Sequence, residues 1–227
     1  MQGFNCTDSS SEWLIYEPDR NCYCVIYRNA IPYEYSCELY NKCVSECTEQ
    51  ILRPHRFNTE AKVVQSINGP INVPKGFLLQ PRTNIAYAND DITGHTYSGQ
   101  TLQTNPWPMC MKILRDFVSQ FKPKFNSCLV NGYLINDHYV DYHRDAELND
   151  EDNTVATVSL GVSRKFRFRE YGNKSTIPKY ETILNNRDIV YFYGNTNLYY
   201  EHMICKAKKN DIVSPRYSVT FRIIKSV

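Results

Sequence analysis

The fold is decided by five stretches in the second half of the chain: SCLVNGY (127–133), TVATVSLGV (154–162), KFRFRE (165–170), DIVYFYG (188–194) and RYSVTFRII (216–224). They are rich in β-branched and aromatic residues and are separated by polar loops, which is typical of strands. No helical period appears among them. Because many strands follow one another without intervening helices, an antiparallel sandwich or barrel is predicted.

Toward the N-terminus the pattern becomes helical in two places. Residues 22–28 predict a short strand, and residues 35–51 predict a helix because apolar and thiol positions recur at helical spacing. Prolines 106 and 108 then suit the start of a second helix. The apolar stripe predicted on that helix consists of Met109, Ile113, Phe117 and Phe121, flanked by Leu114 and Val118.

The segment between the two helices, from about residue 54 to 104, is rich in Asn, Thr, Gly and Pro. It predicts loops and hairpins that can carry binding residues. Together these signals predict an α+β fold that is mainly β: a jelly-roll with helical support on one side. We expect residues 1–55 to form a strand-helix extension packed on the core, and residues 56–227 to form the functional domain.

Composition and charge place the chain among soluble globular proteins. Its 227 residues are 42% apolar and 22% charged, which suits one domain with an extension. The net charge of +2 does not argue for a nucleic-acid partner, so any basic footprint must be local. Since neither a secretion signal nor a membrane-spanning apolar run is found, we expect an intracellular protein, of the nucleus or cytoplasm. The cysteines are then expected to be reduced. Cys37, Cys43 and Cys47 lie in the first predicted helix, where packing is the expected role and a metal site is the alternative.

The first candidate for chemistry is His143-Arg144-Asp145, which places an imidazole and a carboxylate two residues apart. In an extended segment both side chains point to the same side. His202, in a polar stretch after DIVYFYG, is the natural third ligand. Two histidines and one carboxylate form the facial triad of non-haem Fe(II) oxygenases, which leaves metal positions open for a co-substrate and oxygen. Taken in isolation, an HxD pair is more often an exposed structural pair.

The second candidate is the stretch 216–222, where Arg216, Thr220 and Arg222 share one face because side chains alternate along a strand. A guanidinium fork matches carboxylate geometry and stays charged, so it suits a dicarboxylate in a sheltered pocket. Two inward arginines require two anions. The alternative for this pattern alone is the solvated face of an edge strand, but the HxD pair and the distal histidine weigh against it.

These motifs resemble the AlkB family of Fe(II)- and 2-oxoglutarate-dependent dioxygenases. The family's order and approximate spacings are followed, over about residues 73 to 225, by Asn131-Gly-Tyr133, His143-Arg-Asp145-Ala-Glu147, Ser159-Leu-Gly161, Arg164-Lys-Phe166-Arg-Phe168-Arg169, His202 and Arg216-x5-Arg222. The likeness is greatest to the eukaryotic-type repair member that acts on double-stranded DNA. It implies a double-stranded β-helix, with the dioxygenase domain at 56–227 and nucleotide-recognition loops at about 56–104.

The resemblance also implies roles for the matching residues. The Fe(II) ligands would be His143, Asp145 and His202. The co-substrate 2-oxoglutarate would be bound by Asn131, Tyr133, Arg216 and Arg222, assisted by Thr220. Arg216 with Tyr133 would hold the far carboxylate, and Arg222 with Asn131 the one beside the metal. The implied reaction consumes 2-oxoglutarate and O2, dealkylates bases such as N1-methyladenine and N3-methylcytosine in DNA, and releases succinate, CO2 and formaldehyde.

An enzyme that oxidises a base must take it out of the stack, so it requires groups that receive the base. The resemblance implies that Tyr97, in HTYSG, and Glu147 contact the base. It also places an altered apolar finger, which fills the gap left by the base, at Val73, Pro74 and Phe77. For Tyr97 the alternative is ordinary packing, and for Glu147 it is a solvated surface acid.

Basic residues are expected to track the phosphates of the strand. In KFRFR the two phenylalanines alternate with cations, so one face is apolar and the other, made by Lys165, Arg167 and Arg169, is basic. A second patch is expected at Lys206, Lys208 and Lys209. Such contacts give salt-sensitive, sequence-independent affinity. A basic face that only aids solubility is the alternative.

Three other functions fit the same residues. The first is an RNA-specific or single-strand-specific demethylase of the same family. The second is a 2-oxoglutarate hydroxylase that acts on something other than nucleic acid. The third is a metal-stabilised jelly-roll binding module without catalysis, which the two arginines disfavour because a structural metal does not require them. The expected partner remains nucleic acid, with DNA expected before RNA, and neither a membrane nor an obligate protein partner is expected.

Overall fold

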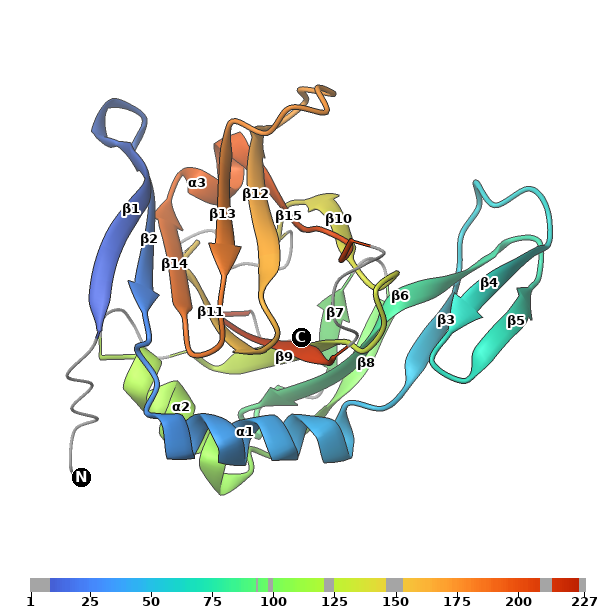
Figure 1. The fold of residues 1–227 in the computed structure, drawn as a ribbon, viewed down its shortest axis with the longest axis horizontal. Coiled ribbons are helices and arrows are strands. Elements are labelled where there is room, and N and C mark those ends of the chain that lie inside the picture. The colour runs from blue at the N-terminus through green and yellow to red at the C-terminus, as the bar shows by residue number, and fades with distance from the viewer. Residues whose placement is uncertain are drawn as a thin grey trace.

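The computed structural model describes residues 9–92, 94–97, 100–120, 125–145, 153–208 and 214–224. They form a larger and a smaller β-sheet, with two helices along the outer side of the larger one and a hairpin that projects to one side (Figure 1). The predicted mainly β jelly-roll with helical support is therefore confirmed. Across the described ranges, no helix is long and apolar enough to cross a membrane.

The larger sheet has the N-terminal strand β1 at one edge and contains the last strand of the chain, β16, in its middle. Its order is β1-β2-β14-β11-β16-β9-β6-β8-β7, and β3 pairs with β6. The bounds are β1 Ser10–Glu17, β2 Cys22–Arg28, β3 Gln50–Pro54, β6 Phe77–Ala88, β7 Gly94–Tyr97, β8 Gln100–Asn105, β9 Ser127–Tyr133, β11 Val155–Gly161, β14 Ile189–Gly194 and β16 Arg216–Arg222. The strand predicted at residues 22–28 is confirmed as β2, and its pairing with β14 makes the N-terminal segment continuous with the core sheet.

The smaller sheet has the order β10-β15-β12-β13. Its strands are β10 Val140–His143, β12 Arg164–Glu170, β13 Tyr180–Leu184 and β15 Tyr200–Ile204. A separate hairpin of β4 (Lys62–Ser66) and β5 (Gly69–Val73) forms the projection seen in Figure 1. The helices are α1 Tyr33–Glu46, α2 Met109–Val118 and the short α3 Thr196–Tyr199, and a 3-10 turn at Pro18–Arg20 joins β1 to β2.

Strand β16 shows how the sequence pattern positions the site. All seven of its residues are buried, as they are in its neighbour β9. Tyr217, Val219 and Phe221 pack in the hydrophobic core that the helices cover. Because side chains alternate, the polar residues of the strand face the space between the two sheets. A polar interior face and an apolar outer face are thus built into one buried strand.

Both predicted helices form, but with different details. The helix predicted at 35–51 ends at Glu46, because residues from Gln50 onward pair with β6 as strand β3. On α2 the predicted stripe is wrong at two positions, since Met109 is 70% exposed and Ile113 is 42% exposed, but Phe117, Leu114 and Val118 are buried as predicted. A strict spacing of four overshoots the 3.6-residue period, so such a stripe winds off the buried face. The buried residues of α2 are Cys110, Met111, Leu114, Phe117 and Val118, and Phe121 lies outside the described residues.

The largest departure from the predicted loops at 54–104 is β6, a strand of twelve residues. Pro81 lies inside it, which obscured the strand in the sequence because proline has no amide hydrogen to donate. The β3–β6 register shifts between the pairs Gln50↔Thr83 and Leu52↔Leu79, so Pro81 lies at the irregularity. Beyond that point β6 pairs regularly with β9 from Thr83 onward.

The cysteines of the first helix behave as predicted where they are buried. Cys43 and Cys47 belong to the core, while Cys37 is exposed. Every cysteine in the described part of the chain is a free thiol. Packing therefore accounts for Cys43 and Cys47.

Candidate active site

The two histidines predicted to bind metal lie on neighbouring strands of the smaller sheet. The antiparallel register of β10 and β15 sets His143 directly opposite His202, with ring centroids 4.3 Å apart. The sequence placed His202 in a polar stretch, but it lies in the middle of β15, against the rings of Phe168 and Phe192. Strand pairing and aromatic packing together fix the position of this imidazole.

Asp145 completes the cluster. Its carboxylate oxygens lie 3.8 Å from Nε2 of His143 and 3.9 Å from Nε2 of His202. One ligand atom from each of the three residues lies within 4.8 Å of the others. Within the described ranges this is the only such cluster of potential metal ligands. The structure thus brings together the three residues that the HxD pair and the distal histidine predicted.

Two residues that the metal does not require hold Asp145 in place. Asn197, on α3, accepts a hydrogen bond from the Asp145 backbone N–H at 2.9 Å and donates one to its carbonyl oxygen at 2.8 Å. Arg222 on β16 donates to Oδ1 of Asp145 at 2.6 Å. Sequence analysis missed Asn197, since nothing about an asparagine fifty-two positions away marks it as a partner of Asp145.

Burial and charge set the protonation of the cluster. Burial lowers the pKa of His202 to about 3, and it lowers the pKa of His143 despite the opposing effect of Asp145. Burial would raise the pKa of Asp145, but Arg222 and the two imidazoles outweigh it and hold that pKa below its usual range. Two neutral imidazoles and one carboxylate result, which is the state that a metal ion binds.

The donor set fits a ferrous ion. Oδ2 of Asp145 is buried and has no hydrogen-bond partner in the described part of the chain, as expected of an oxygen that faces a cation. Two imidazoles and one carboxylate are the ligands of the facial triad, which leaves positions for other ligands. His143, Asp145 and His202 would therefore hold the metal.

Arg216 fits one end of a dicarboxylate. Its side chain is fully buried, donates to Oγ of Ser159 at 3.0 Å and lies 5.1 Å from the ring centroid of Tyr133. Its Nε and Nη1 are buried without a hydrogen-bond partner among the described residues. Burial lowers the pKa of Arg216 to about 10, so the group is still cationic near neutral pH. Two unpartnered guanidinium N–H groups are suited to receive a carboxylate.

Arg222 forms an ion pair with a carboxylate side chain of the protein itself. Two inward arginines were expected to require two anions, and in this structure Arg222 forms its ion pair with Asp145. It lies beside the metal cluster, as the resemblance implied, but its carboxylate partner here is a metal ligand. Thr220, on the same face of β16, bonds through its hydroxyl to Thr157 at 3.2 Å. That Arg222 also contacts the metal-proximal carboxylate of 2-oxoglutarate stays a prediction, and the residue lines the same cavity as Asn131.

A small cavity between the two sheets is lined by both histidines of the metal site, while Asp145 and Arg216 are not among its lining residues. Its polar lining includes His143, His202, Asn131, Tyr133, Thr220 and Arg222. Two residues of β6 orient the side chain of Asn131: its side-chain oxygen accepts hydrogen bonds from Nε of Arg82 at 2.9 Å and from the side-chain amide of Asn84. With that oxygen occupied, Asn131 presents its NH2 group, which suits a carboxylate or keto oxygen.

The predicted base-contact residues are placed only in part. Glu147 lies outside the described residues, and Tyr97 ends β7, whose side chains are outside the description too. The residues of the predicted finger lie at and after the end of β5: Val73 is fully buried, Pro74 is exposed, and Phe77 begins β6 with 37% exposure. The tip of the β4–β5 hairpin lies instead at Ser66–Gly69, where Gly69 has a φ of +96° that favours glycine.

The cationic side chains on the predicted basic face of β12 form ion pairs with glutamates of the neighbouring strands. Lys165 and Arg167 both form ion pairs with Glu181 of β13, at 2.8 and 2.5 Å. Arg169 forms one with Glu201 of β15 at 2.7 Å. The alternation of these cations on one face is as predicted, but their charge is balanced by the neighbouring strands. In the second predicted patch Lys206 is paired with Asp137, and Lys209 lies outside the described residues.

Comparison with known proteins agrees with this site. The family model of the 2OG-Fe(II) oxygenase superfamily matches residues 24–222. The chain is 30% identical to the human DNA oxidative demethylase ALKBH2 over 151 residues, which cover 63% of this chain and 57% of the human protein. It therefore spans little more than half the length of that relative. The alpha-ketoglutarate-dependent dioxygenase AlkB of Escherichia coli is 26% identical over 196 residues, covering 76% and 88% of the two chains.

A solved structure shows the same fold. The structure of OsALKBH1 superimposes with a TM-score of 0.57, covering 88% of this chain and 96% of the other, at 12% identity. At that identity the likeness speaks for the architecture alone. The resemblance to the AlkB family, first carried by the motifs, is confirmed by the relatives, and Fe(II), 2-oxoglutarate and O2 are the ligands typical of that family.

Proposed function

Since this chain belongs to the 2OG-Fe(II) oxygenase superfamily, we propose that it removes alkyl groups from nucleic-acid bases by oxidation. The observation that carries the proposal is that three potential metal ligands lie together in the same interior as a buried Arg216, two of whose N–H groups have no hydrogen-bond partner among the described residues. When bound, iron and 2-oxoglutarate supply the oxidant that hydroxylates the alkyl carbon, and a hydroxylated methyl group leaves the base as formaldehyde.

The residues of the chain would orient these ligands. Arg216, beside Tyr133, would bind the far carboxylate of 2-oxoglutarate, and the NH2 group of Asn131 would donate to its metal-proximal end. Arg222 and Asn197 would keep Asp145 aimed at the metal. Thr220, which lines the same cavity, would assist.

We further propose that the substrate is DNA carrying N1-methyladenine or N3-methylcytosine. What supports DNA is the similarity to a human protein named as a DNA oxidative demethylase. Tyr97 would stack on the extruded base and Glu147 would accept a hydrogen bond from its exocyclic amine. Lys165, Arg167 and Arg169 would reach phosphates only by leaving their carboxylate partners, and a finger would have to be built from Pro74 and Phe77, since Val73 is buried.

The decisive experiment is mass spectrometry of methylated oligonucleotides. Single- and double-stranded DNA and the matching RNA, each with one N1-methyladenine, are incubated with the protein, Fe(II), 2-oxoglutarate and ascorbate. We expect one methyl group to be lost from DNA, with formation of succinate, and no loss with the Asp145→Asn variant. Loss from RNA alone would move the substrate to RNA. Retention of the methyl group in every strand, with 2-oxoglutarate still consumed, would reject base dealkylation.

A further inference from the structure

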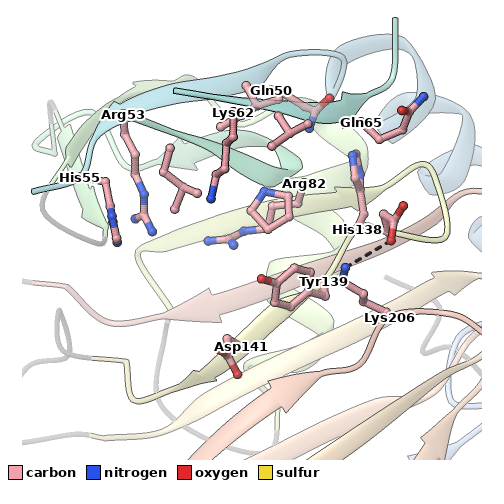
Figure 2. Close-up of a pocket in the computed structure, with 15 residues that line it drawn as sticks. Gln50, Arg53, His55, Lys62, Gln65, Arg82, His138, Tyr139, Asp141 and Lys206 are labelled. Atoms are coloured by element: carbon pink, nitrogen blue, oxygen red, sulfur yellow. Dashed lines mark hydrogen bonds and ion pairs between the residues drawn. The ribbon is translucent and has the colours of Figure 1, made fainter. Parts of the chain in front are cut away.

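A cavity of about 600 Å³ lies outside the metal site. It is bounded on one side by strands near the projecting β4–β5 hairpin and on the other by the loop that leads into β10. Strands β3 and β4 and the start of β6 form one side, and residues 137–141 form the other (Figure 2). Figure 2 shows Arg53 and Lys62 pointing from the upper strands toward the cavity, with Arg82 below them. A space of this size accommodates a group much larger than water.

The charged lining of the cavity is mostly positive. Four cations, Arg53, Lys62, Arg82 and Lys206, face two carboxylates. Asp137 forms an ion pair with Lys206 at 3.2 Å, and Asp141 accepts the backbone N–H of Tyr142 at 2.8 Å and keeps its negative charge. Arg53, Lys62 and Arg82, of β3, β4 and β6, therefore outnumber the one remaining carboxylate among the lining residues. An anion is the ligand that such a lining favours.

His138 provides a second, independent indication of a ligand. The residue is 1% exposed and lines the cavity. Its Nδ1 accepts the backbone N–H of Leu134 at 3.1 Å, so in the neutral ring the hydrogen is on Nε2. Burial lowers the pKa of His138 to about 4, which keeps the ring neutral. Nε2 is buried and has no hydrogen-bond partner in the described chain, so a buried donor beside the cations lacks an acceptor.

We propose that this cavity binds a phosphate group of the nucleic-acid strand through the Nε2–H of His138, the guanidinium of Arg82 and the ammonium of Lys62. The proposal deepens the proposed function and rests on it. Phosphate oxygens are acceptors only and carry negative charge, which matches a lining of donors. By contrast, Lys165, Arg167 and Arg169 of β12 are each already paired with a glutamate.

Arg82 places this phosphate next to the reacting base. Its Nε donates to Asn131, and Asn131 lines the small cavity that also contains His143 and His202. The two cavities are therefore separated by one pair of side chains. A phosphate held on the outer side of Arg82 would fix the register of the strand while its base is at the metal.

The test is a binding titration followed by fluorescence anisotropy, with a short fluorescein-labelled single strand of DNA that carries one N1-methyladenine. His138→Asn is the informative variant, because the asparagine oxygen can replace Nδ1 as acceptor for Leu134 while the Nε2–H donor is lost. Lys62→Ala removes an exposed cation. We expect each change to weaken binding roughly fivefold, the size of one modest contact. The control is Lys112→Ala on α2, which removes an exposed cation away from the cavity and should not change the affinity, and Lys165→Ala tests the basic face of β12 as the competing phosphate contact.

The salt dependence separates a phosphate contact from a structural effect. Lys62→Ala should reduce the slope of log K against log salt by about 0.7, the value for one phosphate contact on a single strand. His138→Asn should lower the affinity without changing the slope, because the ring is neutral. Equal effects of Lys62→Ala and Lys112→Ala, or a loss confined to Lys165→Ala, would overturn the proposal. If a thermal melt shows that His138→Asn does not fold, the proposal is tested by the slope of log K against log salt for Lys62→Ala alone.

The titration, combined with mass spectrometry of the same variants, distinguishes this proposal from the proposed function. Binding that depends on Lys62 and His138, with no loss of methyl groups, would retain the phosphate site and reject dealkylation. Methyl loss that both variants leave unchanged would retain dealkylation and reject the site. Adenosine monophosphate that competes as well as the labelled strand would show that the cavity binds free phosphate esters, and would also overturn the assignment to a strand.

Discussion

At the scale of single residues, Asp145 serves both the metal and the charge balance of the interior. It is the anionic partner of Arg222, which is 2% exposed. Replacing Asp145 by Ala should therefore do two things. Turnover should fall more than a hundredfold because the only anionic ligand is lost. The free energy of unfolding should also fall by about 3 kcal/mol or more, because a buried arginine loses its counter-ion.

The measurement for Asp145→Ala combines succinate formation with unfolding in urea. His202→Ala is the matched control, since it removes a metal ligand without removing a charge. Both variants should lack activity, but His202→Ala should lose less stability than Asp145→Ala. Equal stabilities of the two variants would show that Arg222 is stabilised by something other than Asp145.

Arg216 makes a prediction about the co-substrate. Arg216→Lys should raise the concentration of 2-oxoglutarate required for half-maximal succinate formation by tenfold or more, because an ammonium does not reproduce a two-point guanidinium contact. Ser159→Ala is the control, since it removes the hydroxyl that Arg216 donates to and leaves the guanidinium in place. Its effect should be much smaller. An unchanged requirement in Arg216→Lys would mean that the co-substrate carboxylate binds elsewhere.

At the scale of elements, the four-residue helix α3 positions the metal carboxylate. Asn197 of α3 makes two hydrogen bonds to the backbone of Asp145, which lies just beyond β10. Asn197→Ala should weaken metal binding about ten- to a hundredfold, as is usual when a group that orients a ligand is removed. A titration with Co(II), followed by its visible absorption, measures this affinity. Leu198→Ala, on the same helix but 52% exposed, should bind Co(II) like the wild type, and a similar loss in both variants would point to the fold of α3.

Elements also show what the sequence can predict. The inward face of β16 followed from alternation alone, because a strand buried on both sides must separate its apolar residues from its arginines. The His143 and Asp145 pair was recognisable because both ligands lie on one short segment. Asn197, Arg82 and His138 had no such signal, since each acts through a partner on another element. Their roles come from tertiary pairing, which leaves no period in the sequence.

The same reasoning explains the misread elements. Strand β6 was hidden by Pro81, and its identity comes from pairing with β9 and β3, not from its own pattern. The helix predicted to reach residue 51 ends earlier because the residues from Gln50 onward pair with β6 as strand β3. Local propensity is a weak prior, and partner strands override it.

At the scale of the whole molecule, Glu17 links the two sheets. It ends β1 of the larger sheet and accepts hydrogen bonds from three residues on the smaller-sheet side: Lys179 at 3.0 Å, Tyr180 at 2.6 Å and Tyr200 at 2.8 Å. The link lies at the end of the sheets where β1 meets the turn to β2. It ties strands β13 and β15 to the N-terminal strand, so the segment before the family's matched region contributes to the closure of the jelly-roll.

This network predicts how stability depends on pH. Burial would raise the pKa of Glu17, but the hydrogen bonds from Tyr180, Lys179 and Tyr200 outweigh it and lower the pKa from 4.5 to about 2. A depressed pKa means that the unfolded chain binds a proton more readily than the folded one. The stabilisation is therefore complete above about pH 4.5 and is lost as the pH falls toward 2. After allowance for solvent screening, it amounts to about 1–2 kcal/mol.

The prediction is tested by urea unfolding of the wild type and Glu17→Gln at several pH values. At pH 7 the variant should be less stable by about 1–2 kcal/mol, and the difference should shrink as the pH falls below 4.5 and vanish near 2, because protonated glutamate and glutamine then make similar contacts. Glu12→Gln, on the same strand but with a side chain 54% exposed, is the control for removing a carboxylate of β1 that does not contact the smaller sheet at Tyr180 and Tyr200. A Glu17→Gln difference that is the same at neutral and acidic pH would mean that the carboxylate charge contributes nothing, and that the link between the two sheets is held by shape and neutral hydrogen bonds.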